Sequence, residues 1–190
     1  VDVGRSTGIL GMVVGASGNG WQKMFLTGSY QRSLDEKCRF TLPKSIRDAL
    51  DTSGGLVLYV APGTDGSLVI YTESAFQRLG EQLGQGSPVS QDLRAFSRLF
   101  YSQAQRVEPD RQGRIRLPSD LVAMSLSGRE IVLIGVRDHL EVWDRERWQA
   151  YLGQKQPFYD EIAESAFECP PRAATVVSPE ETTLAAARPR

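Results

Sequence analysis

Apolar and polar positions follow the same order in two stretches of the chain. In the first stretch, the pattern predicts a strand over residues 39–42, a helix over 44–50, strands over 56–60 and 67–71, and a helix that begins near Thr72. Glycine-containing turns separate these elements. The first stretch is therefore predicted to form a strand–helix–strand–strand–helix unit.

The second stretch repeats this order later in the chain. It predicts a strand over 114–117, a helix over 119–124, strands over 130–136 and 140–143, and a helix that begins at Asp144. Matched positions are 75 residues apart before the turn between the last two strands and 72 residues apart after it, so that turn is three residues longer in the first stretch. Because turn length varies more freely than core positions, we interpret the two stretches as an internal duplication.

A connecting segment and two ends of biased composition complete the chain. Leu93, Phe96, Leu99 and Phe100 recur at helical spacing, which predicts a connecting helix with one buried face. Glycines interrupt the apolar run near the start, which favours a disordered extension over a secretory signal. The expected organisation is a disordered extension over 1–23, a first module over 24–86, the connecting helix over 87–106, a second module over 107–168 and a disordered tail over 169–190.

Composition limits the class of protein. With 41% hydrophobic residues among 190, the chain can bury a core, and no apolar run approaches the ~18 residues that a membrane-spanning helix needs. Cys38 and Cys169 lie far apart in different contexts, which indicates neither a metal cluster nor a disulfide framework and favours a reducing compartment. His139 is the only histidine, and we interpret it as a loop or strand-end residue.

The charge of the chain is unusual for a nucleic-acid-binding protein, with a net charge of −1 and an isoelectric point near 5.9. Its distribution is uneven, however. Five basic residues stand between residues 32 and 47 against Asp35 and Glu36, whereas six acidic residues and three arginines follow from Asp160 onward. A local basic surface is therefore compatible with the acidic total.

The strongest shared feature is a D-x-x-x-R motif followed by an apolar residue, one further residue and Leu-Pro. "LDEKCRFTLP" covers residues 34–43 and "PDRQGRIRLP" covers residues 109–118. The aspartate is typical of a β-turn, and the proline suits the first turn of a helix after a strand. Neither the turn nor the start of the helix requires the arginine that both motifs contain. An arginine oriented by a nearby carboxylate keeps N–H groups for a phosphate or for the O6 and N7 edge of guanine.

The two motifs differ at one position, where the first has Cys38 and the second has Gly113. If this position needs a positive φ, cysteine costs on the order of 1 kcal/mol. Either the first turn has relaxed to an ordinary φ and moved Arg39, or it carries strain. The sequence has no phosphate-binding loop, HExxH, CxxC or G-x-S-x-G motif and no catalytic pair in both stretches, which disfavours an enzyme.

The chain resembles the MraZ family, which is related to the AbrB/SpoVT swapped-hairpin transcription factors. The resemblance covers roughly residues 24–168 and rests on "MF" at Met24, the motifs "DEKCR" and "DRQGR", the Leu-Pro after each, and "LEVWDRERW" from Leu140. It implies an α+β fold in which two tandem AbrB-like βαββα modules form one pseudo-symmetric double-split β-barrel unit with outer helices. It also implies a bacterial, cytoplasmic, nucleoid-associated regulator of the division and cell-wall gene cluster.

The same resemblance implies partners and site residues. The partners are double-stranded DNA with short repeated boxes and further copies of the chain in a ring-shaped homo-oligomer. No cofactor, metal, membrane or small-molecule substrate is implied. The expected site comprises the DNA-binding residues Arg39, Arg114, Lys37 and Arg111 and the arginine-positioning residues Asp35 and Asp110.

Two alternatives compete with this function. An antitoxin-like module would bind DNA and a toxin, but such proteins usually carry one DNA-binding copy and a toxin-wrapping tail. A ring-forming scaffold or protein-interaction module without DNA contact would agree best with the acidic isoelectric point. The salt dependence of DNA binding discriminates the scaffold from the regulator.

Overall fold

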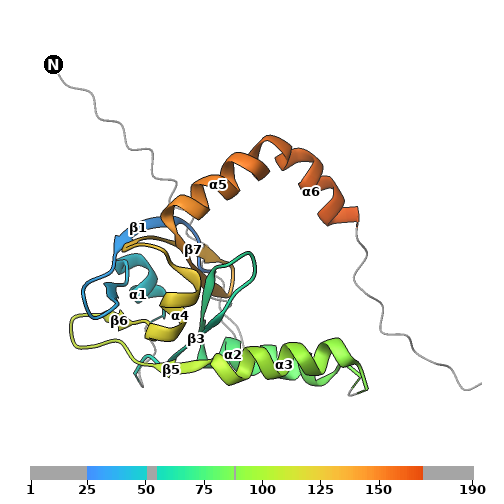
Figure 1. The fold of residues 1–190 in the computed structure, drawn as a ribbon, viewed down its shortest axis with the longest axis horizontal. Coiled ribbons are helices and arrows are strands. Elements are labelled where there is room, and N and C mark those ends of the chain that lie inside the picture. Colours follow the sequence, from blue (N-terminus) through green and yellow to red (C-terminus); the bar gives the residue numbers. More distant parts are fainter. Residues whose placement is uncertain (1–24, 51–54, 88, 169–190) are drawn as a thin grey trace, which may run out of the picture. The chain divides into compact units, whose positions relative to one another are not determined.

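The computed structural model describes residues 25–50, 55–87 and 89–168 (Figure 1). The two ends that the sequence predicts to be disordered, residues 1–23 and 169–190, lie outside the described residues. Helices and antiparallel strands make up the described part, in agreement with the expected α+β class.

The chain divides into two compact units, residues 1–145 and 146–190. The described part of the second unit is helical: a 3-10 turn, η1 (Gln156–Phe158), separates α5 (Arg145–Lys155) from α6 (Tyr159–Glu168). A proline in η1 interrupts the α-helical hydrogen bonds between the two helices. None of the described helices is long and apolar enough to cross a membrane.

The first unit contains the strands and most of the helices of both stretches. The first stretch forms β1 (Ser29–Ser33), β2 (Arg39–Thr41), α1 (Lys44–Leu50), β3 (Leu58–Pro62), β4 (Leu68–Thr72) and α2 (Glu73–Gly84). After α3 (Gln91–Gln103), the second stretch forms β5 (Gln105–Val107), β6 (Arg114–Arg116), α4 (Ser119–Ser125), β7 (Glu130–Val136) and β8 (His139–Asp144). Most of these bounds lie within one or two residues of the sequence prediction.

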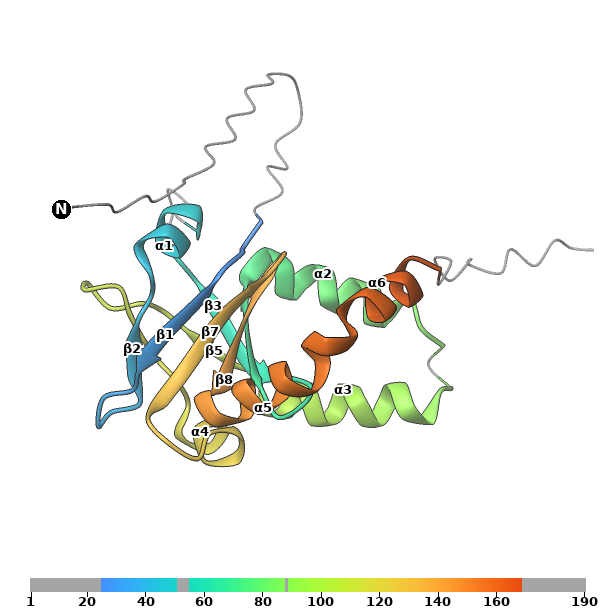
Figure 2. The ribbon, with the colours of Figure 1, turned by 90° about the horizontal axis from the view of Figure 1, so that it is seen from above.

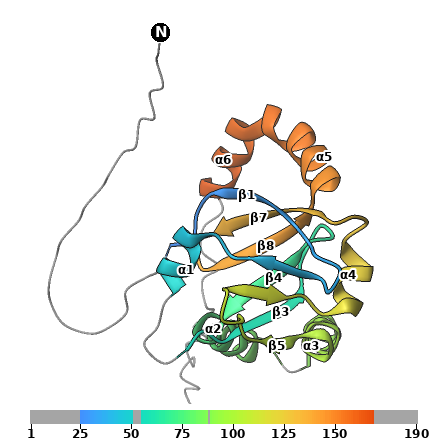
Figure 3. The same cartoon turned by 90° about the vertical axis from the view of Figure 1, so that its left-hand side faces the viewer.

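Strands of both stretches form one six-stranded antiparallel sheet with the order β1-β7-β8-β4-β3-β5. β1 of the first stretch pairs with β7 of the second, and β5 of the second pairs with β3 of the first (Figures 2 and 3). The two central hairpins meet where β4 pairs with β8. Each stretch therefore supplies an edge strand to the hairpin of the other.

The register of the paired strands is two-fold symmetric. A separate two-stranded ribbon, β2–β6, pairs Arg39 with Arg116, Phe40 with Ile115 and Thr41 with Arg114. Its central residues, Phe40 and Ile115, are related by the 75-residue offset, so exchanging the two strands reproduces the same pairing. β4 and β8 pair in the same way about Val69 and Glu141, which are related by the offset of 72. The duplication is thus expressed as symmetric pairing between the stretches.

One hydrophobic core joins the sheet, the β2–β6 ribbon and helices α1 and α4. The Leu-Pro pairs contribute to it as the sequence predicted. Leu42 and Leu117 are 1% and 0% exposed, and burial of a leucine side chain contributes about 1.5–3 kcal/mol. The proline that follows each leucine stands between the ribbon strand and α1 or α4.

Helices α2 and α3 lie side by side (Figures 2 and 3), and Phe76 of α2 packs on Phe100 of α3 with ring centroids 6.0 Å apart. The predicted buried face of the connecting helix is larger than the buried face in the structure. Phe100 is buried, but Phe96 and Leu99 are 44% and 64% exposed. Helical spacing of apolar residues therefore identified the helix but overestimated the surface that this chain covers.

Two further differences concern the segment ahead of each motif. The expected connecting helix over 87–106 ends at Gln103, and the residues from Gln105 form β5 against β3. Strand β1 is also missing from the prediction. Both strands lie at the edges of the sheet and expose many of their side chains, so their apolar pattern is weak and pairing with the other stretch determines their conformation.

Candidate nucleic-acid interface

The β2–β6 ribbon turns one face to the core and the other outward (Figure 3). Its central pair, Phe40 and Ile115, is buried. Successive side chains of a strand point to opposite faces, so the neighbouring positions of both strands share the outer face. That face carries Arg39, Thr41, Arg114 and Arg116. The ribbon thus brings together two arginines that the sequence predicts as site residues.

In the first turn, the Asp35 carboxylate binds both the backbone and Arg39. Oδ1 accepts hydrogen bonds from the backbone N–H groups of Lys37 and Arg39, each at 2.9 Å. Oδ2 accepts from Nε of Arg39 at 2.8 Å and lies 2.7 Å from its Nη2. One carboxylate oxygen therefore shapes the turn while the other orients the guanidinium.

The second turn repeats this arrangement. Oδ1 of Asp110 accepts from the backbone N–H groups of Gln112 and Arg114 at 2.9 and 3.0 Å. Oδ2 lies 2.7 Å from both Nε and Nη2 of Arg114. Among the described residues, no hydrogen bond or ion pair uses Nη1 of Arg39 or Arg114. Each arginine is held along one edge and keeps its terminal edge for another acceptor.

The aspartates are ionised at neutral pH. The hydrogen bond from the Arg39 side chain lowers the pKa of Asp35 to about 2. The hydrogen bond from the Arg114 side chain likewise lowers the pKa of Asp110 below its ordinary value. A charged carboxylate and a charged guanidinium therefore stand together in each turn, and each arginine is oriented without losing its charge.

Cys38 adopts the left-handed conformation of its glycine counterpart. Its φ is 55°, and that of Gly113 is 72°. Both turns close with the same hydrogen bonds: Cys38 N–H donates to the carbonyl of Asp35 at 3.0 Å, and Gly113 N–H donates to that of Asp110 at 2.8 Å. Of the two possibilities that the sequence left open, the turn has kept its shape, and a non-glycine residue there costs on the order of 1 kcal/mol.

The two turns lie at opposite ends of the ribbon, each beside a helix of the other stretch (Figure 3). Leu42, just ahead of α1, donates its backbone N–H to Gly113 in the second turn at 3.1 Å. Leu117, just ahead of α4, donates to Cys38 in the first turn at 2.9 Å. Along the sequence, each helix follows its own motif. In the fold, the pairing of β2 with β6 brings each helix beside the turn of the other motif.

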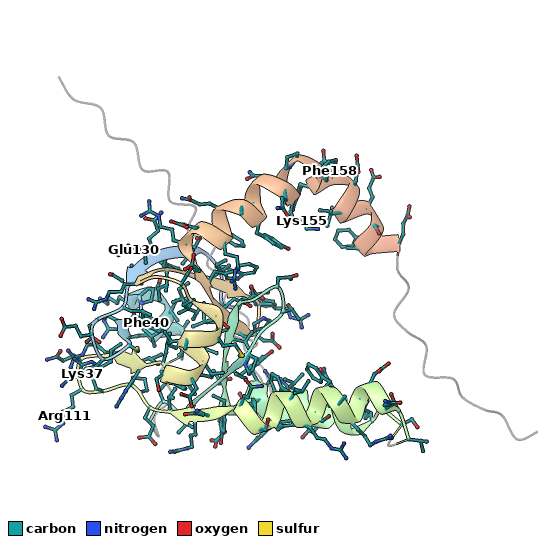
Figure 4. All side chains as sticks on the ribbon, viewed as in Figure 1. Lys37, Phe40, Arg111, Glu130, Lys155 and Phe158 are labelled. Atoms are coloured by element: carbon teal, nitrogen blue, oxygen red, sulfur yellow. The ribbon has the colours of Figure 1, made fainter. Side chains whose placement is uncertain are left out.

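The remaining predicted cations lie in the turns. Lys37 and Arg111 are exposed and extend from the same side of the molecule as the ribbon (Figure 4). Neither forms an ion pair within the part of the chain that the structure describes. Their contact with DNA stays a prediction. Arg116, on the outer face of the ribbon, is absent from the predicted site. Its alternation with the buried Ile115 along the strand could have placed it on the outer face.

His139 begins β8, in agreement with its interpretation as a strand-end residue. Its Nε2 lies 3.6 Å from Oε1 of Glu141 and its Nδ1 lies 3.0 Å from Oδ1 of Asp138. The Glu141 and Asp138 carboxylates raise the pKa of His139 above its ordinary value, against partial burial. Within residues 25–50, 55–87 and 89–168, no three His, Cys, Asp or Glu side chains are grouped to hold a metal ion.

Known proteins are similar in sequence to most of this chain. Residues 100–168 match the family described as "MraZ protein, putative antitoxin-like". The chain is 39% identical over 141 residues to the "Transcriptional regulator MraZ" of Frankia alni, which covers 74% of this chain and 95% of that protein. The protein of the same name from Heliobacterium modesticaldum is 36% identical over 145 residues, which cover 76% of this chain and 98% of that protein. The one from Finegoldia magna is 35% identical over 141 residues, which cover 74% of this chain and 95% of that protein.

Proposed function

The chain belongs to the MraZ family, and on that basis we propose that it is a transcriptional regulator that binds double-stranded DNA through the β2–β6 ribbon and its two turns. Arg39 and Arg114 read base edges, and Lys37 and Arg111 contact backbone phosphates. Asp35 and Asp110 position the two arginines. No step of this function requires bond making or breaking.

The observation that carries the proposal is one side-chain geometry repeated on an exposed ribbon. Each carboxylate binds Nε and Nη2 of its arginine and leaves the terminal Nη1–Nη2 edge available. A two-stranded β-ribbon fits the major groove of B-DNA, and an arginine fork matches the O6 and N7 acceptors of guanine. The adjacent carboxylate repels phosphates, so the pair favours base edges over indiscriminate backbone binding.

The interleaved strands support a more specific architecture. We propose that residues 24–86 and 107–168 are AbrB-like modules that complete one double-split β-barrel. The exchange of edge strands and the two-fold register of β2–β6 and β4–β8 support this architecture. In such an arrangement both motifs reach one surface only when the two modules fold together.

The charge of the chain supports an assembly. A net charge of −1 predicts weak binding of one unit, because phosphate neutralisation provides most of the non-specific affinity for DNA. A ring of copies on repeated promoter boxes makes later contacts intramolecular and raises the overall affinity. We place this activity in the cytoplasm at the nucleoid, on the promoter of the division and cell-wall gene cluster.

The test is selection of duplexes from a random-sequence library by the full chain, followed by binding measurements across a salt series. A regulator predicts enriched repeated boxes, a steep decrease of affinity with salt, and loss of binding in Arg39→Ala and Arg114→Ala. Control variants are Arg78→Ala and Arg98→Ala, which remove exposed arginines from α2 and α3. Absent or salt-insensitive binding contradicts the proposal and favours the ring-forming scaffold.

A further inference from the structure

We propose that Lys44 and Arg47 of α1, together with Arg111 of the second turn, form a subsite for DNA backbone phosphate beside the second motif. This inference rests on the proposed DNA-binding function and extends it. The subsite joins cations from both stretches of the chain, because α1 of the first stretch lies against the turn of the second (Figure 3).

Arg47 lies directly on the second turn. A Cβ atom added to Gly113 would come within 2.7 Å of Nη1 and 2.8 Å of Cδ of Arg47. Nε of Arg47 is buried without a hydrogen-bond partner among the described residues. A buried donor without an acceptor is unfavourable, and an incoming anion that draws the guanidinium toward it gives this cation the partner that it lacks.

The surroundings of Arg47 carry excess positive charge. A groove of about 640 Å³ is lined by charged side chains of α1, of β5 and the segment after it, and of the second turn. Two of its acidic groups are engaged by arginines: Glu108 lies 2.7 Å from Arg106, and Asp110 lies 2.7 Å from Arg114. Of the charged lining residues, this leaves Lys44, Arg47 and Arg111 against Asp48. A phosphate is the anion that a nucleic acid offers to such a set of cations.

The first turn lacks the equivalent subsite. The 75-residue offset relates Lys44 to Ser119 and Arg47 to Val122. It also relates Arg111 to Glu36, so none of the three cations has a basic counterpart. The two arginines of the ribbon are therefore held alike, but among the described residues the three cations beside Arg114 have no basic counterparts beside Arg39.

The test compares the salt dependence of binding for full-length wild type and the double variant Lys44→Gln/Arg47→Gln. The probes are the selected duplex and a scrambled duplex of the same length. Each phosphate contact contributes roughly 0.9 to the slope of log K against log salt, so the variant should lose about 2 from the slope for each bound copy, on both duplexes. The charge-matched control, Arg78→Gln/Arg98→Gln on α2 and α3, should keep the wild-type slope.

A second variant adds cations in place of removing them. Glu36→Arg/Ser119→Lys places exposed cations at the positions equivalent to Arg111 and Lys44, and it should raise the slope by about 2. Loss of Arg47 could unfold the chain, which circular dichroism would detect. In that case the salt slopes of this variant and of the single variant Lys44→Gln, at an exposed position, test the subsite. An unchanged slope in these variants, or an equal decrease in the control, overturns the subsite. Wild type without salt-dependent binding overturns the proposed function itself.

Discussion

The turn at residues 35–38 and the turn at residues 110–113 hold their arginines with the same hydrogen bonds, yet their surroundings differ. In both, one aspartate oxygen binds two backbone N–H groups and the other binds the arginine. The second turn lies beside the basic face of α1, and the first lies beside α4, which begins Ser119-Asp120. Local sequence thus determines the orientation of each arginine, while the exchanged helix determines the charge around it.

The difference also makes a cysteine less costly in the first turn than in the second. Arg47 packs over Gly113, so a side chain there takes on an unfavourable φ and displaces the Arg47 side chain. The residue equivalent to Arg47 near the first turn is Val122. A side chain at position 38 therefore costs only the free energy of the positive φ.

The largest effect is expected from removal of a ribbon arginine. Arg39→Ala and Arg114→Ala should each weaken binding to the selected duplex by about 1–3 kcal/mol, which is the discrimination of one bidentate base contact. Fluorescence anisotropy with selected and scrambled duplexes measures the loss. Arg114→Ala should also lose more non-specific affinity than Arg39→Ala, because it leaves the Asp110 carboxylate, which lines the basic groove, without its arginine partner. Equal residual affinities contradict this difference between the two halves.

The next effect concerns the stability of the second turn. Gly113→Cys should lower the free energy of unfolding by about 1–2 kcal/mol, since an L-residue takes on a positive φ, and displacement of Arg47 adds to the loss. Urea denaturation measures the change. Gly128→Cys serves as control, because a Cβ atom there meets only a backbone nitrogen at 4.0 Å. A loss no larger than in the control would show that the turn tolerates a side chain.

The converse substitution should have a smaller and opposite effect. Cys38→Gly relieves the strain of a positive φ but increases the freedom of the unfolded chain, so the free energy of unfolding should rise by at most about 1 kcal/mol. The salt slope of DNA binding should stay that of wild type, because Arg39 is already held as Arg114 is. A marked loss of stability in urea would indicate that the cysteine side chain itself stabilises the turn.

The smallest effect near neutral pH is the change in stability that arises from titration of the two aspartates. Their pKa values are lowered, to about 2 for Asp35, so their stabilisation is present above the unfolded-state pKa of about 3.9. It is lost as the pH falls through the folded-state pKa. Carboxyl carbon NMR should give both aspartates a pKa below 3.9 and no change in charge between pH 5 and 8. In Asp35→Asn, the part of the acid-induced loss of stability that is due to Asp35 should disappear. An ordinary pKa for either group would show that its arginine contact does not persist in solution.

The sequence predicted the elements whose signals are local. The helix over 44–50 has its predicted bounds because a proline precedes it and its apolar residues Ile46 and Leu50 recur at helical spacing. The D-x-x-x-R motifs predicted turns and oriented arginines, because an aspartate and the N–H groups it binds lie within four residues. Edge strand β5 was missed, because an exposed strand of three residues carries little apolar pattern.

The amino-acid sequence alone defines the duplicated frame, the two motifs and the leucines that anchor the ribbon in the core. The fold adds which segments meet: β2 with β6, α1 with the second turn, and α4 with the first. An apolar pattern indicates whether a side chain is buried, but not against which partner it packs. That choice depends on backbone hydrogen bonds between residues some 75 positions apart, and it determines where Arg47 lies.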